Sequence, residues 1–439
     1  MTKDFAPQLN NETDEYRYRA ILVAIKGNQT PDLSADESLD ELERLLHTDD
    51  GIACGRLVQN LEVAHPTHFI GKGKAEDVRQ LAHSEGANCI LFDDELSPRQ
   101  QATLEEFFGD SLTVLDRTAL ILEIFAHHAT TKEGKLQVEL AMLEYQLPRL
   151  RGMWSHLEKE KLGGGVGARF GTGESQLETD RRLSRKRIGE IKKALTLVRK
   201  DRLTQRSSRL SSTTFRVSLV GYTNAGKSSL LNALTGSEVL AYDKLFATLD
   251  STTRKLELPD KRIVTLTDTV GFIHKLPHQL VAAFRSTLDE VQDAQLLLHV
   301  VDASSPQREM MIRAVSEVLE SIDSHTIPQV LVFNKIDAIS QDELEQLKRL
   351  YPSALFVSAL DGTGFDEILA KITTAANINS EHMEIILPYK EGHLLKMAFE
   401  KTSVMSKEYA DEGIKLSLLV PVSLVGYFAP YRGPISSDS

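Results

Sequence analysis

The sequence predicts a multidomain α/β protein, and three observations support this fold class. The chain has 439 residues, which is enough for about three domains. Short apolar runs alternate with helical patterns in two parts of the chain, as in parallel α/β folds. Between these parts lies a segment with heptad spacing and a glycine-rich interruption. We expect an N-terminal α/β domain over 1–130, an antiparallel helical hairpin over 131–210, a P-loop α/β domain over 211–377 and a small α+β C-terminal domain over 378–439. In the last of these, strand-like runs at 384–388 and 417–429 on either side of a helical segment at 393–403 suggest a βαβ-type arrangement.

Composition excludes several classes of protein. Hydrophobic residues make up 41% and charged residues 26%, which is ordinary for a globular chain. No apolar run reaches the ~20 residues of a membrane helix, and the first residues lack the pattern of a signal peptide. The two cysteines, Cys54 and Cys89, cannot form a disulfide scaffold. We therefore expect a cytoplasmic protein without a membrane span.

The N-terminal part alternates between strand and helix patterns. Apolar runs predict strands at 20–25, 52–58 and 89–92, and periodic leucines and alanines predict helices at 38–46, 75–83 and 99–107. Within it, Gly71-Lys72-Gly73-Lys74 resembles a phosphate loop, but a plain turn explains a lone Gly-x-Gly equally well.

The middle part is strongly basic and predicts a helical hairpin. Residues 151–216 carry 17 Lys and Arg against seven Asp and Glu, whereas the whole chain has a net charge of −12. Two seams have heptad spacing, and they consist of Leu136, Leu140, Leu143 and Leu147 and of Ile188, Ile191, Leu195 and Val198. We expect Pro148 to end the first helix, the second helix to cover 176–203, and a Ser/Thr-rich linker to follow at 206–214.

The tip and the outer face of this hairpin are candidates for RNA binding. Six glycines between Gly163 and Gly173 cannot hold a helix, so we expect a glycine-rich tip there. Close backbone approach and positive charge suit contacts with phosphates and 2′-hydroxyls of structured RNA. The basic residues that we expect to make them are Arg169, Arg181, Arg182, Arg185 and Lys186. A flexible linker without a ligand is the alternative interpretation.

A phosphate-binding loop follows the strand predicted at 215–220. The sequence Gly-x4-Gly-Lys-Ser lies between this strand and a helical pattern, which is its required context. Gly221 and Gly226 allow a tight loop whose N–H groups surround a polyphosphate at a helix N-terminus. Lys227 is expected to reach the β and γ phosphates, and Ser228 to bind Mg²⁺. The loop residues that we expect to contact nucleotide are Gly221, Tyr222, Thr223, Asn224, Ala225, Gly226, Lys227, Ser228 and Ser229.

Three later motifs select guanine nucleotides, and each follows a predicted strand. In the segment Asp268, Thr269, Val270 and Gly271, the carboxylate is placed to hold the Mg²⁺ shell through water, and the Gly271 N–H can sense the γ-phosphate. In the next motif, Asp337 can accept the two N–H groups on the Watson–Crick edge of guanine, a pair that adenine lacks. Asn334 can tie the loop to the base or to the phosphate loop, and the stem of Lys335 can lie over the ring. Ser358, Ala359 and Leu360 can place a backbone N–H on guanine O6. The ordered set therefore predicts binding of GTP and GDP.

One further threonine should contact Mg²⁺ in the triphosphate state. The segment Phe246, Ala247, Thr248 and Leu249 precedes two other threonines, Thr252 and Thr253, and we favour Thr248. We expect Lys227, Thr248 and Gly271 to act together on the γ-phosphate, and Thr248 and Gly271 to be released when it is hydrolysed.

The motifs resemble those of translation-factor-related P-loop GTPases and, more narrowly, of the HflX family. The narrower resemblance rests on Phe69–Lys74, Asp116–Thr118, Gly134–Ala141 and Gly173–Arg182, and it extends from about residue 15 to about residue 375. It implies a cytoplasmic GTPase that binds the large ribosomal subunit and its rRNA, and that helps to split or rescue stalled ribosomes. No DNA partner is expected.

Two positions suggest how hydrolysis is controlled. Many GTPases of this class place Gln directly after the second switch glycine to orient the attacking water, but Phe272 stands there. We therefore expect slow hydrolysis until a partner orders the switches. Asn224 resembles the asparagine of potassium-stimulated GTPases and could hold K⁺ beside the β/γ bridge; an ordinary loop cap is the alternative.

Two other functions remain open at this point. One is an RNA-remodelling nucleotidase with a second, ATP-binding site in the N-terminal domain, for which Gly71 and Gly73 offer weak support. The other is a signalling GTPase that binds a protein effector and no ribosome. A metabolic kinase is the weakest reading, because no substrate site accompanies the motifs.

Overall fold

The computed structural model describes residues 16–27, 34–150, 172–210, 214–236, 245–246, 251–275, 290–378 and 380–433. These residues form two compact units, which are described separately. The first comprises residues 1–200 together with 243–249 and 275–285, and the second comprises 201–242, 250–274 and 286–439. The helices in the described ranges are all too short or too polar to cross a bilayer.

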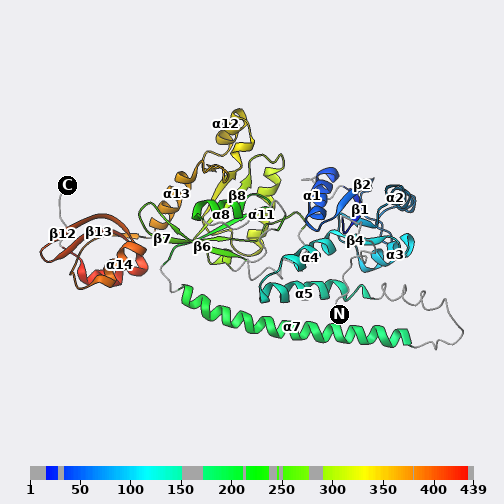
Figure 1. Ribbon diagram of the computed structural model, residues 1–439, viewed down its shortest axis with the longest axis horizontal. Helices are drawn as coiled ribbons and strands as arrows, with labels where there is room; N and C mark the ends of the chain where they lie inside the picture. Colours follow the sequence, from blue (N-terminus) through cyan, green and yellow to red (C-terminus); the bar gives the residue numbers. More distant parts are fainter. Residues whose placement is uncertain are drawn as a thin grey trace. The chain divides into compact units, whose positions relative to one another are not determined.

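The N-terminal domain is a four-stranded parallel sheet with helices on both faces (Figure 1). The strands lie in the order β2-β1-β3-β4. Their bounds are β1 Arg19–Lys26, β2 Ile52–Asn60, β3 Cys89–Phe92 and β4 Thr113–Asp116. The helices are α1 Ala35–Thr48, α2 Lys72–Glu85, α3 Pro98–Phe108 and α4 Arg117–His128. The strands and helices expected from the sequence are confirmed, whereas β4 and α4 had not been predicted.

Local sequence explains where these helices begin. Ser34 and Ser97 each accept a hydrogen bond from the third residue of the helix and receive the reciprocal side chain, which is a capping box. The leucines of α1 predicted from their spacing, Leu39, Leu42, Leu45 and Leu46, are all fully buried. Gly71 is the N-cap of α2 and donates its N–H to the Gln59 side chain, so the Gly71–Lys74 segment begins a helix.

Two further helices of this unit lie side by side, α5 Lys132–Gln146 and α7 Thr172–Leu210 (Figure 1). Arg187 forms two hydrogen bonds with Glu139, of 2.6 and 2.8 Å, and the Lys192 ammonium lies 2.8 Å from Glu144. Ile191, predicted in the second seam, is buried between them. The end of the first helix before Pro148 is confirmed, because α5 ends at Gln146.

Two expectations about these helices were wrong. Helix α7 has 39 residues and continues through Leu210, so 206–210 is helical and not a linker. The buried residues of α5 are Val138, Ala141 and Tyr145, whereas the predicted leucine seam is only half buried. The reason is that α5 also packs on α4, and this second contact buries a different face. The glycine-rich segment 163–171, including Arg169, lies outside the described residues.

The second unit contains a six-stranded sheet in the order β10-β9-β8-β5-β7-β6. Its strands are β5 Arg216–Gly221, β6 Thr252–Glu257, β7 Ile263–Asp268, β8 Leu296–Asp302, β9 Gln329–Asn334 and β10 Leu355–Phe356. All neighbours are parallel except the pair β6–β7. The helices are α8 Lys227–Thr235, α11 Arg308–Ser321, α12 Gln341–Leu350 and α13 Phe365–Asn377.

This topology determines where a ligand binds. Strands β5 and β8 are neighbours in the sheet, and the order along the chain reverses between them. Open α/β sheets bind ligands at such a point, outside the carboxyl ends of the strands. The P-loop follows β5, and the Asn334 motif follows β9, so both reach this edge.

The C-terminal residues form an antiparallel sheet, not the βαβ-type arrangement that the sequence suggested. Its strands are β11 Ser380–Leu387, β12 Ser403–Ala410 and β13 Gly413–Pro421, in the order β11-β13-β12. Helix α14 Gly392–Lys401 packs on the sheet, and short helical turns follow at 422–431. The overlooked strand β12 is almost wholly exposed, so it lacks the alternation of apolar and polar residues that identifies a half-buried strand.

Candidate nucleotide-binding site

The P-loop has a backbone that requires its two glycines. Gly221 has φ +156°, and a Cβ there would lie 2.2 Å from the carbonyl oxygen of Val300. Gly226 has φ +87°, and its Cβ would lie 2.2 Å from the Asn334 side-chain nitrogen. A side chain at Gly221 would therefore displace the Val300 backbone, and a side chain at Gly226 would displace the Asn334 side chain. The loop ends on the N-terminus of α8, where N–H groups carry a partial positive charge.

Lys227 is buried beneath the loop. Its ammonium donates hydrogen bonds to the carbonyl oxygens of Gly221, at 3.1 Å, and Tyr222, at 2.8 Å. Burial lowers the pKa of Lys227 to about 8, and the charge of Asp268 opposes this shift. A polyphosphate would supply further negative charge and favour the ammonium form. The arrangement suits a lysine that exchanges backbone carbonyls for phosphate oxygens.

Two oxygen donors meet beside the loop in a manner that suits Mg²⁺. The Ser228 hydroxyl donates to Asp268 at 2.6 Å, and the Asp268 carboxylate is buried at the end of β7. Hydroxyl and carboxylate oxygens are the ligands that Mg²⁺ prefers. When bound, Mg²⁺ would neutralise charge on the β and γ phosphates. Ser228 and Asp268 are thus the described residues that fit this ion.

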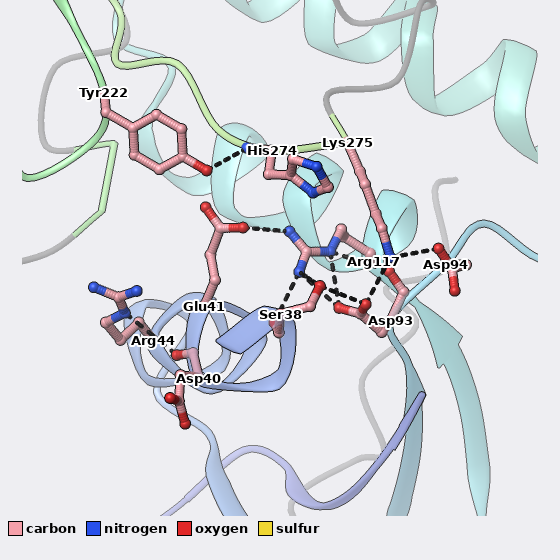
Figure 2. A network of polar contacts seen from close by, with 10 residues as sticks. All are labelled: Ser38, Asp40, Glu41, Arg44, Asp93, Asp94, Arg117, Tyr222, His274 and Lys275. Carbon is pink, nitrogen blue, oxygen red and sulfur yellow. Dashed lines mark hydrogen bonds and ion pairs between the residues drawn. The ribbon is translucent and has the colours of Figure 1, made fainter. Parts of the chain in front are cut away.

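The second switch segment is joined to the P-loop by backbone hydrogen bonds. Phe272 donates its N–H to Gly221 at 3.1 Å and accepts from the Thr223 N–H at 2.8 Å. The Tyr222 hydroxyl accepts the His274 N–H at 2.5 Å, as Figure 2 shows. A Cβ on Gly271 would lie 2.8 Å from Thr223 Cα. Only glycine therefore fits this close approach.

The guanine motif is assembled by Asn334. Its side-chain N–H donates to the Ala225 carbonyl of the P-loop, and its oxygen accepts the Ala359 N–H, each at 3.0 Å. Asn334 therefore holds the phosphate loop and the third guanine segment together, as its predicted tying role requires. The side chain is buried, so these bonds do not compete with water.

Asp337 lies on the exposed side of the same motif. One carboxylate oxygen accepts the Ser358 hydroxyl at 2.6 Å. The Ser358 hydroxyl also accepts from the N–H groups of Leu360 and Asp361, at 3.3 and 3.4 Å. Ser358 is fully buried and so fixes the orientation of a carboxylate that remains exposed to a ligand.

Most of the predicted nucleotide-binding residues lie in one unit of the structure, whereas those of the first switch do not. The loop residues 221–229, Asp268 to Gly271, and the two guanine segments lie in the second unit. Asn224, the candidate K⁺ ligand, has φ +59° and is exposed. Ala247, Thr248 and Leu249 lie outside the described residues. Phe246 is described, but it belongs to the first unit, where its ring packs against Phe125.

Sequence reasoning missed Asp302, which the structure places at this edge. Its carboxylate lies 2.7 Å from the Lys335 ammonium. The position could have been found, because Asp302 is an aspartate at the last position of β8, as Asp268 is at the last position of β7.

Comparisons with known proteins found similar family profiles and solved structures. Three family profiles match in sequence: "GTP-binding GTPase N-terminal" over 36–126, "GTP-binding GTPase Middle Region" over 128–209 and "50S ribosome-binding GTPase" over 216–335. Crystal structures of a GTP-binding protein from the archaeon Sulfolobus solfataricus with GDP include one with 24% identity and a TM-score of 0.40, covering 82% of this chain and 98% of that chain.

Curated relatives are closer. "GTPase HflX" of Lacrimispora saccharolytica is 42% identical over 419 residues, which is 95% of this chain and 97% of the relative. "GTPase HflX" of Escherichia coli is 43% identical over 411 residues, 93% of this chain and 94% of the relative. With this similarity along almost the whole chain and an assembled P-loop, the protein belongs to the HflX family of GTPases, enzymes that hydrolyse GTP.

Proposed function

We propose that this GTPase binds the large ribosomal subunit through rRNA and that its GTP cycle times the splitting or rescue of ribosomes. The observation that carries the proposal is the basic outer face of α7. Arg182, Arg185 and Lys193 are exposed, while Arg187 and Lys192 form the ion pairs with α5. A helix of 39 residues extends about 58 Å at 1.5 Å per residue. Such a charged rod suits phosphate contacts over the surface of folded RNA.

One of the matching family profiles also supports ribosome binding. The profile that matches residues 216–335 is described as a ribosome-binding GTPase of the 50S particle. In the proposal, α5 and α7 form an antiparallel hairpin whose segment 163–173 probes the RNA. The protein acts in the cytoplasm with Mg²⁺ held by Ser228, Thr248 and Asp268, and K⁺ beside Asn224 replaces an arginine finger.

The first unit offers a route from nucleotide to RNA. Two short segments that flank the switches belong to it rather than to the P-loop unit. The Leu245 N–H donates to the Thr48 hydroxyl at 3.2 Å, and Phe246 packs edge-on against Phe125, with ring centroids 4.6 Å apart. The Lys275 ammonium lies 2.7 Å from Asp93 and 2.5 Å from Asp94 (Figure 2).

These contacts lie within the first unit, and the residues that make them are close in sequence to the two predicted switch segments. A γ-phosphate that orders Thr248 and Gly271 would also change the positions of Phe246 and Lys275, which lie only a few residues away in the sequence. The N-terminal domain and α7, which belongs mainly to the same unit, would then respond to the state of the nucleotide. We infer that GTP favours binding to the subunit and that hydrolysis releases the protein.

The test of the proposed function is a binding assay with isolated large subunits. We expect cosedimentation with a non-hydrolysable GTP analogue and little with GDP. Replacing Arg182, Arg185 and Lys193 by Gln should weaken binding at least tenfold and reduce the slope of log affinity against log salt by about two, at ~0.7–0.9 per lost phosphate contact. Deleting 163–173 tests the tip in the same assay.

The matched control makes the same charge change in the C-terminal domain, at Lys396, Lys407 and Lys415. Equal losses for both triple variants would show only a general charge effect and contradict the proposed interface. Absence of binding in every nucleotide state would favour the signalling switch instead.

The ion pairs of Lys275 with Asp93 and Asp94 can be tested by mutation. Lys275→Ala should leave basal GTP hydrolysis within about twofold and reduce hydrolysis stimulated by large subunits about fivefold or more, because the second switch is no longer coupled to the bound domain. Single-turnover rates with and without subunits measure both quantities. Lys261→Ala removes an exposed ion pair with Glu257 and is the control. Equal stimulation of the Lys275 variant and the wild type would rule out this route.

The second nucleotide site receives no structural support. The carboxyl edge of the N-terminal sheet, where a ligand of this topology would bind, carries Asp93 and Asp94. These carboxylates pair with Lys275, and Asp93 pairs with Arg117 as well, so the cations at this edge are already engaged by carboxylates. The Gly71–Lys74 motif begins α2, and the Gly71 N–H already donates to the Gln59 side chain at 2.9 Å.

A further inference from the structure

Asp302 lies at the point of the sheet where the nucleotide motifs gather. It is the last residue of β8 and pairs in register with Asn334, the last residue of β9. The next residue, Ala303, donates its N–H to the Asn334 carbonyl at 2.8 Å. The carboxylate is therefore fixed relative to the guanine motif by the sheet itself.

The two carboxylate oxygens of Asp302 have different partners. One accepts hydrogen bonds from the Ser304 N–H at 2.9 Å and from the Ser304 hydroxyl at 2.6 Å. The other lies 2.7 Å from the Lys335 ammonium. The side chain of Asp302 is 18% exposed and that of Lys335 is 31% exposed, so the pair is largely shielded from solvent. Bonds to Ser304 thus hold the carboxylate in place for the lysine.

Lys335 needs such a partner. Its backbone has φ +63°, in the left-handed region, so its side chain leaves the strand end in an unusual direction. A free lysine side chain samples many rotamers and loses that freedom if its stem must lie flat against a base. Fixing the ammonium removes most of this loss before the nucleotide arrives.

We propose that Asp302 is a positioning residue for purine recognition, acting through Lys335. It anchors the ammonium so that the aliphatic stem forms one wall of the guanine site. The inference rests on the assignment of Lys335 to the base, which is itself part of the proposed site. Because the base is the same in GTP and GDP, the effect on affinity is equal for both nucleotides.

The sign of the effect separates this role from simple electrostatics. A carboxylate near a polyanion disfavours binding, so removing its charge alone would tighten the affinity for GDP. If Asp302 positions Lys335, removing the charge weakens binding instead.

The experiment is a double-mutant cycle on the full chain with Asp302→Asn and Lys335→Ala, using a fluorescent GDP analogue as the probe. Asp302→Asn keeps the shape and can still accept from Ser304. It should raise the Kd for GDP and for a GTP analogue by about three- to tenfold, through faster dissociation. In the Lys335→Ala background the same change should have no further effect. Glu257→Gln, which removes a charge from an exposed pair, is the control.

Each outcome has a distinct meaning. An unchanged or lowered Kd for Asp302→Asn, or additive effects of the two changes, overturns the positioning role. An unchanged Kd for Lys335→Ala overturns the assignment of Lys335 to the base. If Asp302→Asn lowers the thermal stability of the domain, Lys335→Met tests the same contact, since it keeps an unbranched stem and removes the anchored head; it should reproduce the three- to tenfold loss.

Discussion

Replacing Asp337 by Asn is expected to lower the affinity for GTP and GDP by about a thousandfold or more and to create a preference for xanthosine nucleotides. The carboxylate only accepts hydrogen bonds, and the Watson–Crick edge of guanine presents two N–H donors to it. An amide presents its own N–H to one of them, which leaves two donors facing each other. Sites built on such bonds discriminate by up to ~10⁴–10⁵ when the partner is wrong.

Xanthine reverses the mismatch, because it carries a carbonyl oxygen where guanine carries an amino group. The amide can then donate to that oxygen and accept from the ring N–H. Competition titrations with GDP, xanthosine diphosphate and ADP measure the change. The control is Asp342→Asn, at an exposed carboxylate in the first turn of α12. Retained guanine preference in the Asp337 variant would contradict the role assigned to this residue.

The phosphate and guanine segments could be predicted because each depends on neighbouring residues. Gly221 and Gly226 flank a loop of fixed length between a strand and a helix, and the local sequence shows all three. Asp268 and Asn334 each end an apolar strand. Parallel strands bring their carboxyl ends to one edge, so the position along the chain was enough to place these residues together.

Other features depend on packing between distant elements, which periodicity cannot reveal. Helix α4 is buried around almost its whole circumference, so it lacks the polar face that identifies an amphipathic helix. The leucines of α5 have the correct spacing, but contacts with both α4 and α7 decide which positions are buried. The contact of Lys275 with Asp93 joins residues 182 positions apart, and no local pattern indicates it.

The largest stability effect is expected at Arg117, the buried centre of the N-terminal domain. Its guanidinium lies 2.9 Å from Glu41 and 2.6 Å from Asp93, and it also donates to the Ser38 carbonyl at 3.0 Å (Figure 2). Arg117→Met keeps the approximate volume but leaves two carboxylates buried without this cation. We expect a loss of about 3–5 kcal/mol in the unfolding free energy of the domain.

Hydrogen exchange gives a local measurement of this loss, because peptides from α1, β3 and α4 should lose protection while peptides from β5 and α8 keep it. Arg56→Met is the control: Arg56 pairs with Asp40 and Glu43 at the surface, and its loss should cost less than about 1 kcal/mol. Equal loss of protection in the two variants would show that the buried ion pairs of Arg117 contribute no more to stability than the exposed ion pairs of Arg56.

The pH dependence distinguishes lost charge pairing from lost packing. Burial alone would raise the pKa of Asp93, but Arg117 and Lys275 hold it well below its ordinary value. In the wild type, the stability that Asp93 contributes is therefore present above pH ~4 and is lost as the pH falls further. Without Arg117, burial should raise the pKa of Asp93, so that protonation relieves the buried charge. The destabilisation of Arg117→Met should then be smaller at pH 5 than at pH 8, whereas a cavity or a steric fault would cost the same at both values.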